Sequence, residues 1–166
     1  MGLYGRLVDR VTIPAIKHSV YIEVLPSRVY ETLTTADGWD AWFTTGATVD
    51  AKAGGSIQLR WADWGPAHVT TSSDGPVLEA TPDVRFVFQW TPARTTTTVA
   101  FDLIPTKSGT VIELEETGYT DDPKDLKMLV SCATGWGEAL ALLKVYLEHG
   151  IAYGRPNRVA RGKDSR

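Results

Sequence analysis

The feature of this sequence that most constrains its fold is a change in hydrophobic period near residue 122. Upstream of it, several short segments alternate apolar and polar residues, a pattern typical of strands. From Pro123 to His149, apolar residues recur every three or four positions, which predicts one long helix. Its apolar side covers an arc of about 200°, wider than that of an ordinary surface helix. We therefore expect a curved sheet to cup this helix, or a second chain to cover its other side.

The residues at both ends of this segment indicate where the helix starts and stops. Asp122 is a favourable N-cap, and Pro123 suits the first helical position because the N–H it lacks would have no partner there. Gly150 follows the last periodic residue and is the residue type that most often ends a helix.

The elements before the long helix are predicted from alternation, helical spacing and turn residues. Residues 16–24 predict a first strand. Pro26 is expected to begin a short helix, and a second short helix is expected over 37–43 with Asp37 as its cap. Further strands are predicted over 46–50, 56–61, 77–79, 84–90, 96–104 and 110–117, with turns at 65–66 and 74–76.

This order of elements indicates the α+β class, with one long helix packed on a face of an antiparallel sheet. A long helix cannot fill a strongly bent sheet completely. The space left between them is expected to be a cavity lined by aromatic residues, which is a common setting for a small-molecule site.

The composition excludes several other classes of protein. A chain of 166 residues is about the size of one domain, and 43% hydrophobic residues exclude wholesale disorder. Seventeen Lys and Arg residues against twenty Asp and Glu residues give a net charge of −3, which argues against nucleic acid as a partner. The single cysteine excludes an intrachain disulfide and a multi-cysteine zinc site.

The sequence also carries expectations about the compartment. It has no uninterrupted apolar run of about eighteen residues, so no membrane span is predicted. Charges at Arg6, Asp9 and Arg10 interrupt the N-terminal segment, which does not resemble a signal peptide. With one cysteine and no export signal, the chain is expected in the cytoplasm.

Three regions are expected along the chain. Residues 1–15 are an N-terminal extension, residues 16–150 the folded domain, and residues 151–166 a flexible basic tail. The alternative for the tail is an electrostatic arm that binds phosphate or an acidic partner. Its cationic residues are Arg155, Arg158, Arg161, Lys163 and Arg166.

Apolar residues, most of them aromatic, are the candidate ligand-binding residues. They are interpreted either as plain core, because aromatic side chains dominate cores, or as the lining of a cavity. We expect about half of them to face a ligand. The candidates are Trp42, Phe43, Trp61, Phe86, Phe88, Trp90, Phe101, Trp136 and Leu140.

Glu116 is the most informative polar residue, and it joins the candidate binding residues. The period of two places it on the same strand face as Ile112 and Leu114, and therefore inside the protein. There a carboxyl group would act as an acid or base, or as a hydrogen-bond anchor. The alternative is that strand twist or a bulge near Gly118 turns it to solvent.

Other chemistry-bearing residues lack a supporting pattern. His18, His68 and His149 lie in different predicted elements without the spacing of metal ligands, so no metal site and no cofactor are predicted. No Gly-x-Ser-x-Gly motif is present. Cys132 lies within the predicted long helix and is interpreted as a small core residue.

Several segments, in this order and spacing, resemble a known family. Residues 20–23 and 26–34 are similar to the start of START-like (SRPBCC, birch-pollen-allergen-like) domains, and more narrowly to the group of homologues of the activator of a heat-shock-chaperone ATPase. The resemblance covers residues 16–150. Further matching segments are Trp42-Phe43, Gly54-Gly55, residues 75–79, 86–90 and 109–114, and in the last helix Gly135-Trp136, Leu140, Leu143-Lys144, Tyr146-Leu147 and Gly150.

The resemblance implies the helix-grip fold, in which a curved antiparallel sheet of seven strands wraps round the C-terminal helix. It also implies a hydrophobic cavity that binds lipids, polyketides, hormones or similar molecules. Two positions depart from the family pattern. Leu25 stands where the family usually has Ser or Ala, and Glu116 stands where it often has a histidine, so the chemistry of that histidine is not carried over.

Three functions are compatible with these observations. The first is non-catalytic binding of a small apolar or amphipathic ligand in the internal cavity. The second is protein interaction, as a co-chaperone-like module or a homodimer, which the broad apolar arc of the last helix favours. The third is an enzyme of the cyclase, hydrolase or isomerase kind, with Glu116 as its acid or base.

Overall fold

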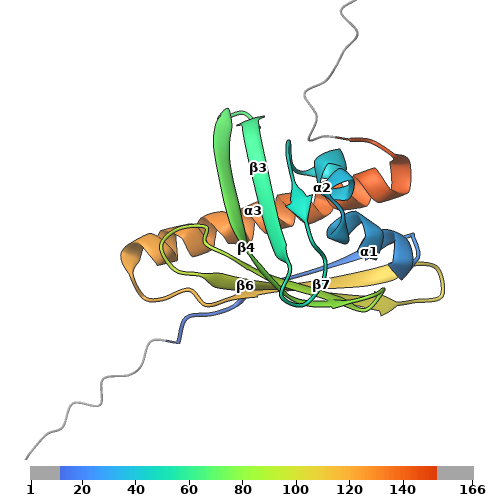
Figure 1. The fold of residues 1–166 in the computed structure, drawn as a ribbon, viewed down its shortest axis with the longest axis horizontal. Coiled ribbons are helices and arrows are strands. Elements are labelled where there is room, and N and C mark those ends of the chain that lie inside the picture. Colours follow the sequence, from blue (N-terminus) through green and yellow to red (C-terminus); the bar gives the residue numbers. More distant parts are fainter. Residues whose placement is uncertain (1–11, 153–166) are drawn as a thin grey trace, which may run out of the picture.

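The structure is a computed structural model that describes residues 12–152. One sheet and three helices form the domain (Figure 1). The strands are β1 (Ile16–Ile22), β2 (Thr48–Val49), β3 (Ser56–Trp64), β4 (Val69–Thr81), β5 (Arg85–Trp90), β6 (Thr97–Pro105) and β7 (Thr110–Thr117). The helices are α1 (Pro26–Thr34), α2 (Ala36–Trp42) and α3 (Pro123–His149).

All seven strands join one antiparallel sheet in the order β1-β7-β6-β5-β4-β3-β2. Figure 1 shows α3 lying across the strands, with α1 and α2 beside its C-terminal half. The α+β class and the helix-grip architecture expected from the sequence are therefore confirmed.

Helix α3 begins and ends where its capping residues predict. The Asp122 side chain accepts a hydrogen bond from the backbone N–H of Lys124 at 2.8 Å. At the other end, Gly150 has φ 68°, a left-handed conformation that favours glycine. Two contacts tie the helix to β1: His18 Nε2 donates to the carbonyl of Ala133 at 2.8 Å, and Lys144 Nζ donates to the carbonyl of Tyr21 at 2.6 Å.

The cap of α2 differs from the expectation. Thr35, not Asp37, precedes the helix, and its hydroxyl accepts a hydrogen bond from the backbone N–H of Gly38 at 3.1 Å. Asp37 lies inside the first turn, where a negative charge interacts favourably with the helix dipole.

The predicted turn at residues 74–76 is also wrong, because these residues lie inside β4. Gly75 is needed there for close packing: a Cβ atom at this position would lie 2.0 Å from the backbone oxygen of Gln89. Just beyond these residues, β4 has an irregularity, because its register with β5 shifts between Val77 and Glu79. A glycine and a proline beside a bulge resemble a turn in sequence although the strand continues.

The core lies between the concave face of the sheet and the helices, and aromatic rings fill much of it. Trp39, Trp42, Phe86, Phe88 and Phe101 are completely buried. Their rings contact one another, with the centroids of Phe88 and Phe101 6.5 Å apart and those of Trp39 and Trp42 5.1 Å apart. The middle of the domain is therefore packed by its own side chains.

Helix α3 is the one helix among residues 12–152 that is long and apolar enough to cross a membrane by those two measures. One such helix is weak evidence for a span, because the core helix of a soluble protein passes the same test. The expectations for residues 1–11 and 153–166, which include most of the N-terminal extension and of the basic tail, lie outside the described residues.

Candidate binding pocket

A half-open pocket of about 400 Å³ lies between the β3–β4 hairpin and α3. We call it the aromatic pocket. Its lining comes from four parts of the chain: the residue after α2, the two hairpin strands, the end of β5 with the residues that follow it, and α3. The lining residues are Phe43, Trp61, Trp64, Val69, Thr71, Ser72, Ser73, Trp90, Thr91, Pro92, Met128, Ser131, Gly135 and Glu138.

Four aromatic rings in this lining contact one another. Phe43 meets both Trp61 and Trp64 edge to face, with centroid distances of 5.4 Å in each case. Trp61 continues the contact to Trp90, whose ring centroid is 6.3 Å away. Edge-to-face arrangements of this kind are favourable and hold the rings in fixed positions. They form a continuous aromatic wall opposite Met128 of α3.

An irregularity in β3 brings Trp61 and Trp64 into the same pocket. Strict alternation would put residues three apart on opposite faces of a strand. The register between β3 and β4 shifts between these two tryptophans, and Asp63 between them has φ 53°. The bulge therefore turns Trp64 back toward the side that Trp61 faces.

Glu116 lies next to this pocket but inside the core, with none of its surface exposed. Its Oε1 accepts three hydrogen bonds: from Trp90 Nε1 at 2.8 Å, from the Thr97 hydroxyl at 2.6 Å and from the Tyr119 hydroxyl at 2.9 Å. Its Oε2 accepts one from Trp136 Nε1 at 2.7 Å. Indole groups can only donate, so both carboxylate oxygens act as acceptors.

This network assigns Glu116 a structural role. All four donors come from the protein itself, and Glu116 is not among the residues that line the aromatic pocket. A buried carboxylate is tolerated in an apolar core when hydrogen bonds replace its lost hydration, as they do here. The geometry therefore favours an anchor inside the protein over an acid or base in contact with substrate.

Two further titratable groups adjoin this network. Burial raises the pKa of the Tyr119 hydroxyl, which also hydrogen bonds with Cys132. Burial likewise raises the pKa of the Cys132 thiol to about 11, with the nearby charge of Glu116 acting in the same direction. Both groups are therefore protonated at neutral pH, and Cys132 has no thiolate character that would make it a nucleophile.

The structure brings only some of the predicted binding residues to the aromatic pocket. Phe43, Trp61 and Trp90 line it. The other candidates are buried and are not part of its lining: Trp42, Phe86, Phe88, Phe101, Glu116, Trp136 and Leu140. The sequence leaves two orientations open for Glu116, and its complete burial shows that the inward one is present.

One of the buried candidates has an unusual polar atom. The indole N–H of Trp42 is buried and has no hydrogen-bond partner among residues 12–152. Its ring stacks on that of Phe43, a pocket residue, at a centroid distance of 5.1 Å. An unpaired buried N–H of this kind is costly, typically by about 1–3 kcal/mol.

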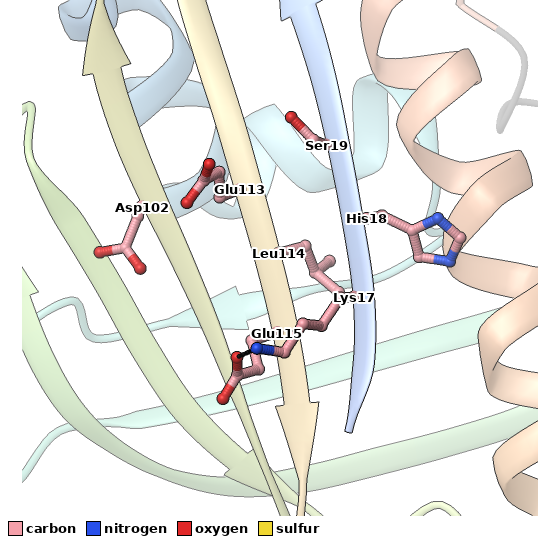
Figure 2. Close-up of a pocket in the computed structure, with 7 residues that line it drawn as sticks. All are labelled: Lys17, His18, Ser19, Asp102, Glu113, Leu114 and Glu115. Carbon is pink, nitrogen blue, oxygen red and sulfur yellow. Dashed lines mark ion pairs between the residues drawn. The ribbon is translucent and has the colours of Figure 1, made fainter. Parts of the chain in front are cut away.

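A second pocket, of about 430 Å³, lies on the outer face of the sheet and has a polar lining. Figure 2 shows that Lys17 and Glu115 point to this side of the sheet, whereas His18 points toward the helix. Lys17 Nζ lies 2.9 Å from Glu115 Oε2, and both side chains are well exposed. The polar lining and this exposed ion pair are typical of a solvated outer face rather than of a ligand cavity.

No group of three or more His, Cys, Asp or Glu side chains within residues 12–152 is arranged to hold a metal ion. The three histidines lie in different parts of the chain, and His18 and His68 have different partners. His18 binds the backbone of α3, and His68 pairs with the neighbouring carboxylate of Asp63 in the β3–β4 connection.

Comparison with known proteins relates this fold to a described family and to solved structures. A family model described as activator of Hsp90 ATPase homolog 1-like protein matches residues 23–148, which is well over half of the chain. No curated protein is similar enough to this chain to count as a match.

Solved structures share the fold at low sequence identity. The solution structure of the Aha1 dimer from Colwellia psychrerythraea is 22% identical, with 83% of this chain and 98% of that chain covered and a TM-score of 0.69. CalU16 from Micromonospora echinospora is 22% identical, with coverages of 84% and 82% and a TM-score of 0.65. DynU16, a protein of the dynemicin biosynthetic locus, is 18% identical, with coverages of 86% and 51% and a TM-score of 0.72. Family and fold together support a ligand-binding domain in general.

Proposed function

Since this chain belongs to the activator of Hsp90 ATPase homolog 1-like family, we propose that it binds a small hydrophobic or amphipathic molecule in the aromatic pocket without chemically changing it. The observation that carries the proposal is the pocket itself, about 400 Å³ in volume and walled by four contacting aromatic rings. Pockets that bind small molecules typically have volumes of about 300–1,000 Å³ and a mainly apolar lining.

The polar groups of the pocket fit the same function. Thr71, Ser72, Ser73 and Thr91 add hydroxyl groups at the hairpin side of the lining. Glu138 of α3 adds one carboxyl group to the lining. A few polar groups among apolar walls orient a ligand and provide specificity. We keep the cytoplasm as the proposed compartment, because the sequence has a single cysteine.

Replacing Trp64 by alanine tests this proposal. Removing the indole takes away roughly 60 Å² of apolar contact, worth about 1.5 kcal/mol, so the affinity for a neutral apolar probe is expected to fall about tenfold. Anilinonaphthalene, which is neutral and fluoresces when it leaves water, is a suitable probe for titration.

The matched control is Val84→Ala, a truncation at a residue that is 54% exposed and does not line the pocket. It is expected to leave the affinity unchanged. Urea unfolding of both variants shows that each is folded. Saturable binding that is equally strong in the wild type and in Trp64→Ala would contradict the proposal, as would a wild type that does not bind the probe.

Exposed apolar residues on α3 favour a second candidate function, which is self-association. Leu126, Val130 and Val145 are 40%, 65% and 37% exposed. They lie within an arc of about 100° on the helix, away from the core. The Aha1 structure from Colwellia psychrerythraea, which shares the fold, is described as a dimer. A co-chaperone-like contact with another protein would use the same kind of surface.

A charge on this face of α3 tests the second candidate. If two copies meet there, Val130→Glu is expected to convert a dimer into a monomer, because a carboxylate buried in an apolar interface has no partner. Size-exclusion chromatography with light scattering measures the mass of the particle. Val84→Glu, which adds the same charge at an exposed site elsewhere, is expected to remain dimeric. A monomeric wild type at high concentration would overturn the candidate.

A further inference from the structure

A cationic pocket adjoins the aromatic pocket at the N-terminal end of α3. Its volume is about 410 Å³, and it is lined by Ala93, Arg94, Lys124, Lys127, Met128 and Ser131. Met128 and Ser131 also line the aromatic pocket, so the two pockets are neighbours that share these two side chains of α3.

The cationic residues that line this pocket come from two parts of the chain. Lys124 and Lys127 lie on the first turns of α3, and Arg94 lies in the connection between β5 and β6. Among residues 12–152, the side chains of these three cations make no ion pair within 4 Å.

Two acids at the start of α3, Asp122 and Asp125, make hydrogen bonds with groups other than these three cations. Asp125 is buried, and its Oδ2 accepts hydrogen bonds from the hydroxyl and the backbone N–H of Thr120 at 2.7 and 3.2 Å, whereas its Oδ1 has no hydrogen-bond partner among residues 12–152. Side-chain hydrogen bonding with Thr95 and with Thr120, together with the charge of Arg94, lowers the pKa of Asp125. The N-cap Asp122 is likewise engaged, with the backbone N–H of Lys124. Asp125 partly offsets the charge of Arg94, whereas Lys124 and Lys127 have no acid within ion-pair distance among residues 12–152.

We propose that the aromatic and cationic pockets together bind one amphipathic anion. Its apolar body lies against Trp61, Trp64 and Met128, and its carboxylate, sulfonate or phosphate group lies between Arg94, Lys124 and Lys127. This inference rests on the proposed function and narrows it, because it names the charge of the ligand and the end of the groove at which that charge is bound.

Two physical arguments select an anionic small molecule as the occupant. A neutral ligand would fill the aromatic pocket but would gain nothing from three cations beside it. Like charges that line one pocket also repel one another, and an anion bound between them would relieve this repulsion. Since the cations lie on the rim of an apolar hollow, the ligand must carry its charge at one end.

Two probes with the same apolar body separate this inference from the proposed function. Anilinonaphthalene is neutral, whereas anilinonaphthalene sulfonate carries one negative charge. The wild type is expected to bind the sulfonate about tenfold more tightly than the neutral compound in low salt, with the difference shrinking as salt screens the charges. Fluorescence titration measures both affinities.

The variant that tests the cationic pocket is the triple substitution Arg94→Gln, Lys124→Gln and Lys127→Gln. It is expected to weaken binding of the sulfonate about tenfold and to leave binding of the neutral probe within twofold. The matched control removes three positive charges elsewhere, through Lys17→Gln, Lys52→Gln and Lys107→Gln. It is expected to change neither affinity, and urea unfolding shows that both triple variants are folded.

The results of these titrations distinguish failure of this inference from failure of the proposed function. If the neutral probe binds in the aromatic pocket but both triple variants bind the sulfonate equally well, this inference is overturned and the proposed function stands. If neither probe binds the wild type, both fail. Sedimentation with phosphatidylglycerol vesicles tests the alternative that the three cations bind an anionic lipid surface. Vesicle binding that depends on the three cations, without any effect on the sulfonate, would assign them to a lipid surface and overturn the inference.

Discussion

Replacing Glu116 by glutamine is expected to lower the free energy of unfolding by about 3 kcal/mol, although the two side chains have nearly the same shape. The carboxylate accepts four hydrogen bonds in a completely buried position. An amide offers one accepting oxygen and one donating nitrogen, so an N–H would face either the indole of Trp136 or the opposite group of three donors. A buried donor without an acceptor costs about 1–3 kcal/mol, and loss of a charged acceptor adds to this.

Urea unfolding followed by tryptophan fluorescence measures the effect. With a denaturant slope of about 2 kcal/mol/M, the midpoint is expected to fall by roughly 1.5 M. Glu115→Gln is the matched control on the same strand, since Glu115 makes only an exposed ion pair with Lys17. Its effect is expected to remain below about 1 kcal/mol. Equal midpoints for the two variants would show that the network around Glu116 contributes nothing to stability.

Truncation of Phe88 to alanine is expected to cost about 3–5 kcal/mol of unfolding free energy. The ring is completely buried at the centre of the aromatic core, with centroids 6.3 Å from that of Trp39 and 6.5 Å from that of Phe101. The loss combines the transfer free energy of the ring with the cavity left behind. Neighbouring indoles are held by their own contacts, so they cannot collapse into the space.

The same unfolding measurement tests this prediction. Val84→Ala removes an apolar group just before the same strand, but Val84 is 54% exposed, so a change within about 0.5 kcal/mol is expected. Phe88→Leu, which keeps most of the volume, is expected to lie between the two. If Phe88→Ala proved no less stable than Val84→Ala, the centre of the domain would have to be loosely packed, contrary to the structure.

The architecture was predictable from the sequence because local signals and packing agree. Helix α3 carries its start and stop at Asp122 and Gly150, and the structure uses both. In β7, alternation puts Glu116 on the same strand face as Ile112 and Leu114, and the structure buries all three, which excludes the solvent-facing alternative for Glu116. At residues 74–76 the glycine and proline favour a turn, but the strand continues through them. The predicted turn was wrong because Gly75 allows β4 to lie close to the backbone of Gln89.

The pocket was less predictable because tertiary contacts define it. Alternation put Trp61 on the inner face, but Trp64 reaches the same pocket through a bulge at Asp63. An aspartate can adopt a positive φ more readily than most residues, yet this preference is too weak to locate a bulge in advance. Met128 and Gly135 line the pocket because α3 lies against the β3–β4 hairpin, and these two elements are far apart in the sequence. Nothing in the local pattern links Trp136 to Glu116, twenty residues away.

The single carboxylate of Glu116 also has a consequence for how a guest molecule binds. Its hydrogen bonds join β5, β6, the segment after β7 and α3, and outward movement of the helix would leave Oε2 buried without the donor that Trp136 supplies. This carboxylate therefore restrains α3 against β5 and β6. If a small molecule occupies the aromatic pocket as proposed, the α3 side of that pocket is expected to be preformed rather than shaped by the bound molecule.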